Sequence, residues 1–351
     1  MTAADNYPIV TTEQYIEGIG KTHLVKLDQI SKEIGRNVYF KAEYENSGTS
    51  IKDRAANYLL KDALESGKLT PGGTLAEATA GNTGLSLALL GRTYDPPFKV
   101  VLFVPENLVQ EKIDLLESLG ATVVKGPLVA PDHPEYVNNL AIKYAKETPN
   151  TIHVNQMDNL ANRRAHYETT GPEIWEQTNG KVDGFVAGAG TGATFGGVVS
   201  FLKTKNPNLK AFVADREGSG LYSYVTSKGE SWAAEGDSLI EGVGKLALTG
   251  QLHDLLDLAD GAYRQIDRDV VLQIYELFDQ GLDIGASGGL NILSAVQLAK
   301  SLPEGSTVVT TVADHAHRYA SKLLNKEYLE SNGIWEYIPE HLRKYATFTQ
   351  V

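Results

Sequence analysis

Lys52 is the residue of this chain whose setting best suits a chemical role. It lies in a polar segment, Asn46–Arg54, that runs directly into an expected helix. The positive end of a helix dipole disfavours an ammonium group near the N-terminus and therefore favours the free amine. A lysine held there can form a Schiff base with a carbonyl compound. Taken alone, the segment also fits an ordinary surface lysine at the start of a helix.

A second polar segment, Glu77–Gly84, separates an expected strand from a helix that starts near Thr83. The unpaired backbone amides at that N-terminus, with threonine and asparagine side chains beside them, would form a socket for a carboxylate. The alternative is that these residues serve only as a helix cap.

A glycine-rich segment, Gly188–Thr194, follows another expected strand and precedes another helix. Glycines let backbone amides converge on a phosphate without Cβ clashes. The segment is not a Walker loop, because no Gly-Lys-Ser/Thr follows, and its place in mid-chain fits a dinucleotide fingerprint poorly. A tight turn without a ligand is the alternative.

The elements around these segments are short apolar or β-branched runs that alternate with segments of helical periodicity. The runs are apolar on consecutive residues, as in parallel strands that helices bury on both faces. Ligands of open α/β sheets bind beyond the carboxyl ends of such strands. The expected strands are Val38–Ala42, Thr74–Glu77, Lys99–Val104, Thr122–Val124, Thr151–Val154, Gly184–Ala187, Lys210–Ala214 and Ser306–Val312. The expected helices are Arg54–Ser66, Thr83–Arg92, Leu108–Leu119, Glu135–Glu147, Thr194–Lys205, Asp269–Asp279, Gly289–Ser301 and His317–Asn325. We therefore expect an α/β protein with two mostly parallel sheets flanked by helices.

The composition excludes several classes of protein. With 351 residues, 42% of them hydrophobic and 22% charged, the chain is of the globular type and long enough for two domains. The absence of cysteine excludes disulfides, cysteine-ligated zinc, iron–sulfur clusters and a cysteine nucleophile. A net charge of -12 without a long basic run argues against nucleic acid as a partner. No signal peptide is readable and no apolar run could span a membrane, so we expect a cytoplasmic protein without a membrane partner.

The three polar segments together resemble the fold-type II pyridoxal-phosphate enzymes, specifically the cysteine synthase and cystathionine β-synthase family. The resemblance covers most of the chain and rests on many short matches that occur in order. They are Tyr39–Glu43 leading to Ser50–Arg54, Thr79–Gly84, Val104–Glu106 with Gln110–Lys112, Asn155–Gln156, Ala165–Trp175, Gly190–Gly192, Glu241–Gly244 and Gly285–Gly288. Each match alone is weak, whereas the ordered series is specific.

The resemblance implies a role for each candidate residue. Lys52 would hold pyridoxal 5'-phosphate as an internal aldimine and move the proton at the substrate Cα, and Asn82 would hydrogen-bond the cofactor's 3-hydroxyl group. The residues that would bind the cofactor phosphate are Gly190, Thr191, Gly192, Ala193 and Thr194. Those that would bind the carboxylate of an amino-acid substrate, and close the small domain over it, are Thr79, Gly81, Thr83 and Gln156.

The resemblance also implies domains and a reaction. A small N-terminal domain would span residues 47–158, and a large cofactor-phosphate domain would comprise 1–46 and 159–340, in the tryptophan synthase β-like fold. O-acetylserine or serine would lose its β-substituent to give an aminoacrylate, to which sulfide or another nucleophile adds. The alternatives are β-elimination, as in a serine dehydratase or cysteine desulfhydrase, and a catalytically weakened relative that binds a partner. We also expect a homodimer.

The chain departs from the family pattern around the expected site. Asn46–Ser50 replaces Asn-Pro-Gly-Gly-Ser, Lys21–His23 replaces Asn-Thr-Pro, and Ala193 stands where glycine is common. Ala313–Tyr319 replaces Pro-Asp-Ser-Gly-Glu-Arg-Tyr, which puts His315 where the family has the serine at the pyridine nitrogen.

We expect His315 to contact the ring nitrogen of the cofactor. An imidazole there can accept a hydrogen bond from a protonated ring or donate one to a neutral ring. His315 and His317 with Asp314 also fit a pair of metal ligands, but no third histidine lies near them in sequence, so we expect no metal.

Overall fold

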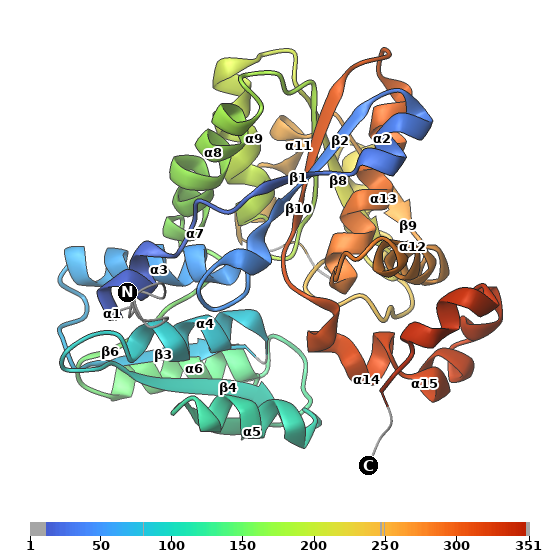
Figure 1. Cartoon of the computed structure of the whole chain (residues 1–351). Coiled ribbons are helices and arrows are strands. Elements are labelled where there is room, and N and C mark those ends of the chain that lie inside the picture. The colour runs from blue at the N-terminus through green and yellow to red at the C-terminus, as the bar shows by residue number, and fades with distance from the viewer. Residues whose placement is uncertain (1–11, 80, 246–247, 249, 349–351) are drawn as a thin grey trace, which may run out of the picture. The chain divides into compact units, whose positions relative to one another are not determined.

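The computed structural model describes residues 12–79, 81–245, 248 and 250–348 (Figure 1). The chain divides into two compact units. The first comprises Met1–Lys21, Asn46–Gly48 and Lys52–Gln156, and the second comprises Thr22–Glu45, Thr49–Ile51 and Met157–Val351. The chain thus passes several times from one unit to the other before Lys52. The expected domain boundaries, 47–158 against 1–46 with 159–340, stay a prediction.

The first unit is built on a four-stranded parallel sheet with the strand order β5-β4-β3-β6. The strands are β3 (Thr74–Ala78), β4 (Lys99–Pro105), β5 (Thr122–Gly126) and β6 (Thr151–His153). The helices are α1 (Thr12–Glu17), α3 (Lys52–Glu65), α4 (Asn82–Gly91), α5 (Gln110–Ser118) and α6 (Val137–Glu147).

Helices cover both faces of this sheet. Val101 and Phe103 of β4 pack with Ala141 of α6. The residue between them, Leu102, lies against α4, where a Cβ on Gly84 would come within 2.9 Å of its side chain. Successive side chains of a strand point to opposite faces, so both faces of β4 are buried. This explains why the strand is apolar without a break.

The second unit contains a six-stranded sheet with the order β1-β2-β10-β7-β8-β9, in which only the β1–β2 pair is antiparallel. The strands are β1 (Leu24–Lys26), β2 (Asn37–Ala42), β7 (Gly184–Gly188), β8 (Lys210–Arg216), β9 (Gly261–Gln265) and β10 (Thr307–Val312). The α-helices are α2 (Asp28–Ile34), α7 (Ala161–Ala165), α8 (Gly171–Gln177), α9 (Ala193–Lys205), α10 (Leu221–Thr226), α11 (Leu255–Leu258), α12 (Asp267–Asp279), α13 (Ala286–Ser301), α14 (Ala320–Leu323) and α15 (Lys326–Ser331). A π-helical segment, η3 (His166–Thr170), joins α7 to α8. The 3-10 helices are η2 (Glu43–Glu45), η4 (Gly250–Leu252), η5 (Ala316–Tyr319), η6 (Trp335–Tyr337) and η7 (Glu340–Tyr345).

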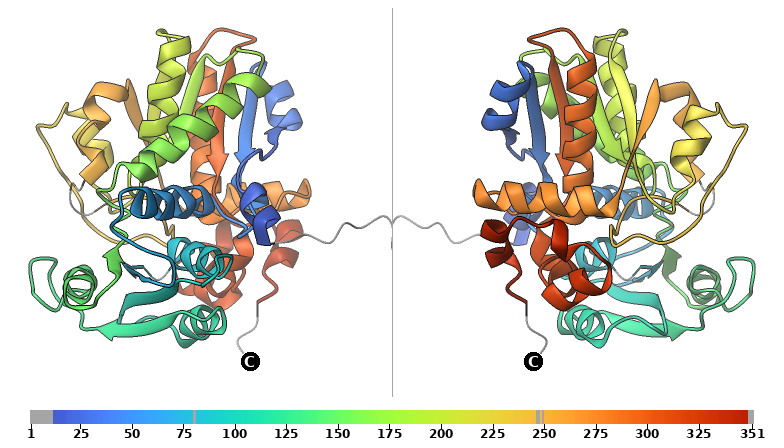
Figure 2. Two further views of the ribbon diagram at one scale, coloured as in Figure 1. Left: turned by 90° about the vertical axis from the view of Figure 1, so that its left-hand side faces the viewer. Right: turned by 90° about the vertical axis from the view of Figure 1, so that its right-hand side faces the viewer.

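Two hydrophobic cores lie on the two faces of this sheet. Val308 of β10 belongs to the core made with α12 and α13, and its neighbour Val309 belongs to the core made with α9. Figure 2 shows α12 running across α13 on one side of the sheet. Between these cores β10 pairs with β7 in parallel, with Val308 opposite Gly184 and Val309 opposite Phe185.

The expected α/β class with two mostly parallel sheets is confirmed, and so are all eight expected strands. The continuous helix expected over His317–Asn325 is wrong. A 3-10 turn, η5, precedes the single-turn helix α14, because Tyr319 has a non-helical backbone and its hydroxyl donates to Asp314 at 2.6 Å. Among the described residues, no helix has the length and apolar character needed to cross a membrane.

Candidate active site

Lys52 is the first residue of α3 and is partly buried. Its neighbour Asp53 fixes the start of this helix. The buried Asp53 carboxylate accepts a hydrogen bond from Gly48 N at 2.8 Å through one oxygen and from Ser86 Oγ at 2.6 Å through the other. A Cβ on Gly48 would clash with that carboxylate, so the turn requires glycine there. The start of α3 is thereby tied to α4.

A buried hydrogen-bond network lies at the start of α4. Thr83 Oγ1 donates to Gln156 Oε1 at 2.6 Å, and Gln156 N donates to Glu77 Oε2 at 3.2 Å. Burial raises the pKa of Glu77 to about 7, although hydrogen bonds from Gln156 oppose the shift. The network brings together two of the predicted carboxylate-binding residues and a carboxyl group that can titrate near neutral pH.

The rest of the predicted carboxylate socket precedes this helix. Gly81 is the N-cap residue and makes no side-chain cap hydrogen bond. Its carbonyl oxygen accepts a hydrogen bond from Leu85 N at 3.3 Å, and its amide donates to Thr79 Oγ1 at 3.3 Å. Asn82 is the first helical residue and is partly exposed. Because neither Thr79 nor Asn82 is the N-cap, a purely capping role does not account for their presence. Ala80, in the same motif, lies outside the described residues.

The glycine-rich segment connects β7 to α9, as expected. Gly192 has a φ of 86° and is the N-cap of α9. A Cβ on Gly190 would clash with the carbonyl oxygen of Gly242, and one on Gly192 would come within 2.8 Å of Leu252. The side chain of Ala193 is fully buried, so the methyl group that distinguishes this loop from the family pattern packs inside the second unit.

The two threonines of this loop are held through their hydroxyl groups. Thr191 Oγ1 accepts hydrogen bonds from Ala193 N at 3.2 Å and Asn162 Nδ2 at 3.4 Å. Thr194 Oγ1 lies 3.1 Å from Nε2 of His166, a buried histidine. A helix N-terminus with oriented hydroxyls beside it is a set of hydrogen-bond donors suited to phosphate.

His315 follows β10, and its side chain is 34% exposed. Its Nδ1 lies 3.2 Å from the carbonyl oxygen of Asp283 and 3.4 Å from the carboxylate of the same residue. The ring packs against Tyr44, with 4.4 Å between ring centroids. With Nδ1 held at Asp283, the Nε2 edge of the imidazole is the edge left for another partner.

Asp283 also contacts the second histidine of this segment. His317 Nδ1 lies 2.6 Å from its carboxylate, and Ala316 N donates to the same group at 3.0 Å. Asp314 instead accepts a hydrogen bond from Tyr319. No group of three or more potential metal-ligating side chains occurs within the described ranges.

Within each unit the structure gathers the predicted residues at one end of the sheet. In the first unit Thr83 and Gln156 are in direct contact, and the loop of Thr79, Gly81 and Asn82 leads into the same helix. In the second unit the phosphate loop and His315 follow the carboxyl ends of β7 and β10, which are adjacent parallel strands. Lys52 belongs to the first unit.

A family model described as pyridoxal-phosphate dependent enzyme matches residues 15–314. The chain belongs to this family. Cysteine synthase 1 of Emericella nidulans is 46% identical over 331 residues, which cover 94% of this chain and 89% of that protein. The O-acetylserine dependent cystathionine beta-synthase of Bacillus subtilis is 38% identical over 309 residues, which cover 87% of this chain and 95% of that protein.

A solved structure is also similar to this pyridoxal-phosphate enzyme. The crystal structure of O-acetylserine dependent cystathionine beta-synthase from Helicobacter pylori matches with a TM-score of 0.79 and 32% sequence identity. The match covers 90% of this chain and 98% of the chain in that crystal structure. The resemblance to fold-type II enzymes and the expected cofactor are thereby confirmed.

The residues present fit the cofactor in their chemistry. An amine at a helix start suits the aldehyde carbon, and the loop before α9 offers backbone amides with two threonine hydroxyls to a phosphate dianion. Sequence reasoning missed the supporting residues Asp53, Glu77 and His166. His166 lies inside the matched segment Ala165–Trp175, but nothing in the sequence indicates that it contacts the phosphate loop.

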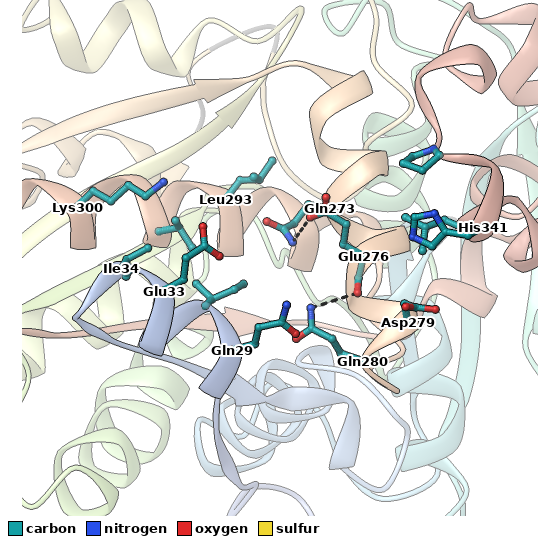
Figure 3. A pocket seen from close by; sticks show the side chains of 14 residues that line it. Gln29, Glu33, Ile34, Gln273, Glu276, Asp279, Gln280, Leu293, Lys300 and His341 are labelled. Atoms are coloured by element: carbon teal, nitrogen blue, oxygen red, sulfur yellow. Dashed lines mark hydrogen bonds between the residues drawn. The ribbon is translucent and has the colours of Figure 1, made fainter.

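The second unit also has a pocket of about 490 Å³ (Figure 3). Helices α2, α12 and α13 line it with the chain after Ile338, and none of the predicted site residues lies in it. Glu33 and Glu276 face it, and burial together with the charge of Glu33 raises the pKa of Glu276. The pocket therefore belongs to a different part of the unit.

Proposed function

We propose that this protein is a cysteine synthase-type enzyme that carries out β-replacement on O-acetylserine or serine. The observation that carries the proposal is the buried Thr83–Gln156 pair at the start of α4, a hydrogen-bonding site suited to the carboxylate of an amino acid. The name of the Emericella nidulans relative, cysteine synthase 1, supports formation of cysteine, and the name of the Bacillus subtilis relative supports O-acetylserine as the substrate.

Each predicted residue has a role in this proposal. Lys52 holds the cofactor covalently, Asn82 hydrogen-bonds its 3-hydroxyl group and His315 offers Nε2 to its ring nitrogen. Gly190, Thr191, Gly192, Ala193 and Thr194 bind the cofactor phosphate. Thr79, Gly81, Thr83 and Gln156 bind the substrate carboxylate. Pyridoxal phosphate, when bound, supplies the electron sink for the reaction.

Lys52 also acts on the substrate directly. Once the substrate amino group has taken its place on the cofactor, the free amine of Lys52 would take the proton from Cα, and the bond from Cβ to the acetate oxygen would break, with the electron pair leaving on acetate. Sulfide then forms a bond to Cβ, and Lys52 returns a proton to Cα. A lysine held at a helix N-terminus suits this exchange, because the free amine is favoured there.

The test is product formation by the purified protein supplied with pyridoxal phosphate. O-acetylserine with sulfide should yield cysteine and acetate, and Lys52→Ala should abolish the reaction. Serine in place of O-acetylserine identifies the leaving group, and homocysteine in place of sulfide identifies the nucleophile. Formation of pyruvate as the sole product from every substrate would contradict β-replacement and favour β-elimination.

We further propose that the protein works in the cytoplasm as a homodimer, with no nucleic-acid or membrane partner. We also propose that residues 47–158 form one domain and residues 1–46 with 159–340 the other. Sedimentation velocity tests the dimer, and fractionation of the source cells tests the location.

A further inference from the structure

The phosphate loop is supported by one long helical segment, Ala161–Gln177, which consists of α7, η3 and α8. Its middle turn, His166–Thr170, is π-helical, and such turns recur at functional sites. Helix α9 faces this segment with glycine. A Cβ on Gly197 would lie 2.7 Å from Cβ of His166. The missing side chain therefore lets the two helices approach until the imidazole of His166 reaches the first turn of α9.

Two residues on one face of this segment contact the two threonines of the phosphate loop. Asn162 and His166 are four residues apart, which places them on the same side of a helix. Asn162 Nδ2 donates to Thr191 Oγ1 at 3.4 Å, and His166 Nε2 lies 3.1 Å from Thr194 Oγ1. A single helix face thus reaches both hydroxyl groups that are suited to a phosphate.

The imidazole of His166 has a hydroxyl group at each ring nitrogen. Nδ1 lies 2.9 Å from Thr170 Oγ1, and both residues are buried. A neutral imidazole has one N–H donor and one acceptor nitrogen. The hydrogen bonds therefore run in one of two directions along the chain Thr170–His166–Thr194.

The direction decides what Thr194 can offer to a ligand. If Thr170 donates to Nδ1, then Nε2–H donates to Thr194 Oγ1, and the Thr194 hydroxyl proton remains to bind an anion. In the opposite direction the Thr194 hydroxyl donates to Nε2, and its proton is already used. Phosphate accepts hydrogen bonds at every oxygen when it is a dianion, so it selects the first direction.

We propose that His166 is a positioning residue that orients the Thr194 hydroxyl toward the cofactor phosphate through its Nε2–H tautomer. The inference rests on the proposed function, because that function places the phosphate at Gly190–Thr194. Asn162 likewise orients the hydroxyl group of Thr191. The Thr191 oxygen accepts hydrogen bonds from Asn162 Nδ2 and from Ala193 N, so its hydroxyl proton points away from both donors.

The tautomer is measured directly by nitrogen-15 NMR of the histidine side chains in the wild-type holoenzyme, with His166→Gln used to assign the signal. The expected spectrum shows the proton of His166 on Nε2. A proton on Nδ1, or on both nitrogens, overturns the proposal. The tautomer itself is read from the wild-type protein, and the variant serves only to assign the signal.

Affinity of the apoenzyme for two probes tests the positioning role. His166→Leu should weaken binding of pyridoxal 5'-phosphate by about tenfold or more, the size expected for loss of an oriented hydrogen bond to an ionised group. Binding of pyridoxal, which lacks the phosphate, should stay unchanged. His166→Gln keeps an N–H donor and should retain most of the affinity. The proposal is overturned if His166→Leu loses as much affinity for pyridoxal as for pyridoxal 5'-phosphate. It is also overturned if His166→Gln loses as much affinity for pyridoxal 5'-phosphate as His166→Leu does.

The matched control is His341→Gln, since His341 is an exposed residue of η7 and lines the separate pocket. Its affinity for both probes should equal that of the wild type. Failure of the proposed function has a different signature: the wild-type protein either does not attach pyridoxal phosphate to Lys52 or forms only pyruvate from every substrate. If it attaches the cofactor there and His166→Leu binds it normally, only the role of His166 is refuted.

Discussion

Replacement of Glu77 by glutamine should change how the stability of the protein depends on pH. Burial raises the pKa of Glu77 from 4.5 to about 7, so the folded chain binds this proton more tightly than the unfolded chain does. The contribution of this group to the free energy of unfolding is therefore fully present below about pH 4.5 and is lost as the pH rises to about 7. The difference between the pKa of Glu77 in the unfolded chain, 4.5, and in the folded chain, about 7, corresponds to roughly 3 kcal/mol in the free energy of unfolding.

Glu77→Gln removes this dependence, because the amide is neutral at every pH and its oxygen can still accept the hydrogen bond from Gln156 N. Relative to the wild type, the variant should gain up to roughly 3 kcal/mol in free energy of unfolding between acidic pH and pH 8. A constant offset from the new NH₂ group does not affect this slope.

Urea titrations of both proteins at several pH values, followed by circular dichroism, measure the difference. The control is Glu117→Gln, an exposed position on α5. The reasoning would be refuted if the difference in free energy of unfolding between Glu77→Gln and the wild type did not change with pH. It would also be refuted if the variant became less stable relative to the wild type as the pH rises.

Four further experiments, three of them on variants, test the site and its support. Borohydride reduction of the holoenzyme followed by peptide mapping should place the pyridoxyl group on Lys52, and a label on another lysine would contradict the assignment. Thr83→Val removes the hydrogen bond to its buried glutamine partner and should raise KM for the amino acid about tenfold while cofactor absorbance persists. Gly197→Ala crowds the helix that packs on α9 and should lower the free energy of unfolding by about 1–3 kcal/mol in urea titrations, whereas an unchanged midpoint would show that the helices can separate. His315→Ser should alter the cofactor spectrum and the pH dependence of turnover; unchanged spectra and rates would remove His315 from the mechanism.

The sequence predicts the elements that carry strong local patterns and misses those set by distant contacts. The turns before α4 and α9 stand out because glycine and small polar residues separate an apolar run from a helix. The helix Ala161–Gln177 was not predicted, since charged and polar residues fill most of its first ten positions and the π-helical turn breaks the 3.6-residue period. The short edge strands β1 and β9 were missed as well.

Contacts between residues far apart in the sequence lie beyond such patterns. The family motif predicts the place of His315 in the sequence, but the carbonyl oxygen and the carboxylate that hold its ring belong to Asp283, which precedes it by 32 residues. No spacing rule connects the two. The same is true of His166 and Thr194, which are 28 residues apart and meet because a glycine on α9 leaves room for the imidazole.

The assignment of Asn46–Gly48 to the first unit and of Thr49–Ile51 to the second limits how this protein can be dissected. A fragment that begins at Lys52 would lack Gly48, whose amide is a hydrogen-bond donor to the buried carboxylate of Asp53. It would also lack Asn46, whose side chain accepts a hydrogen bond from Gly20 N at 2.7 Å. A fragment that starts earlier carries Ile51, whose own amide donates to the carbonyl of Ala313 in the other unit's sequence. No single cut yields a first unit with all its hydrogen bonds, so expression of either half alone should give a protein that aggregates or is rapidly proteolysed.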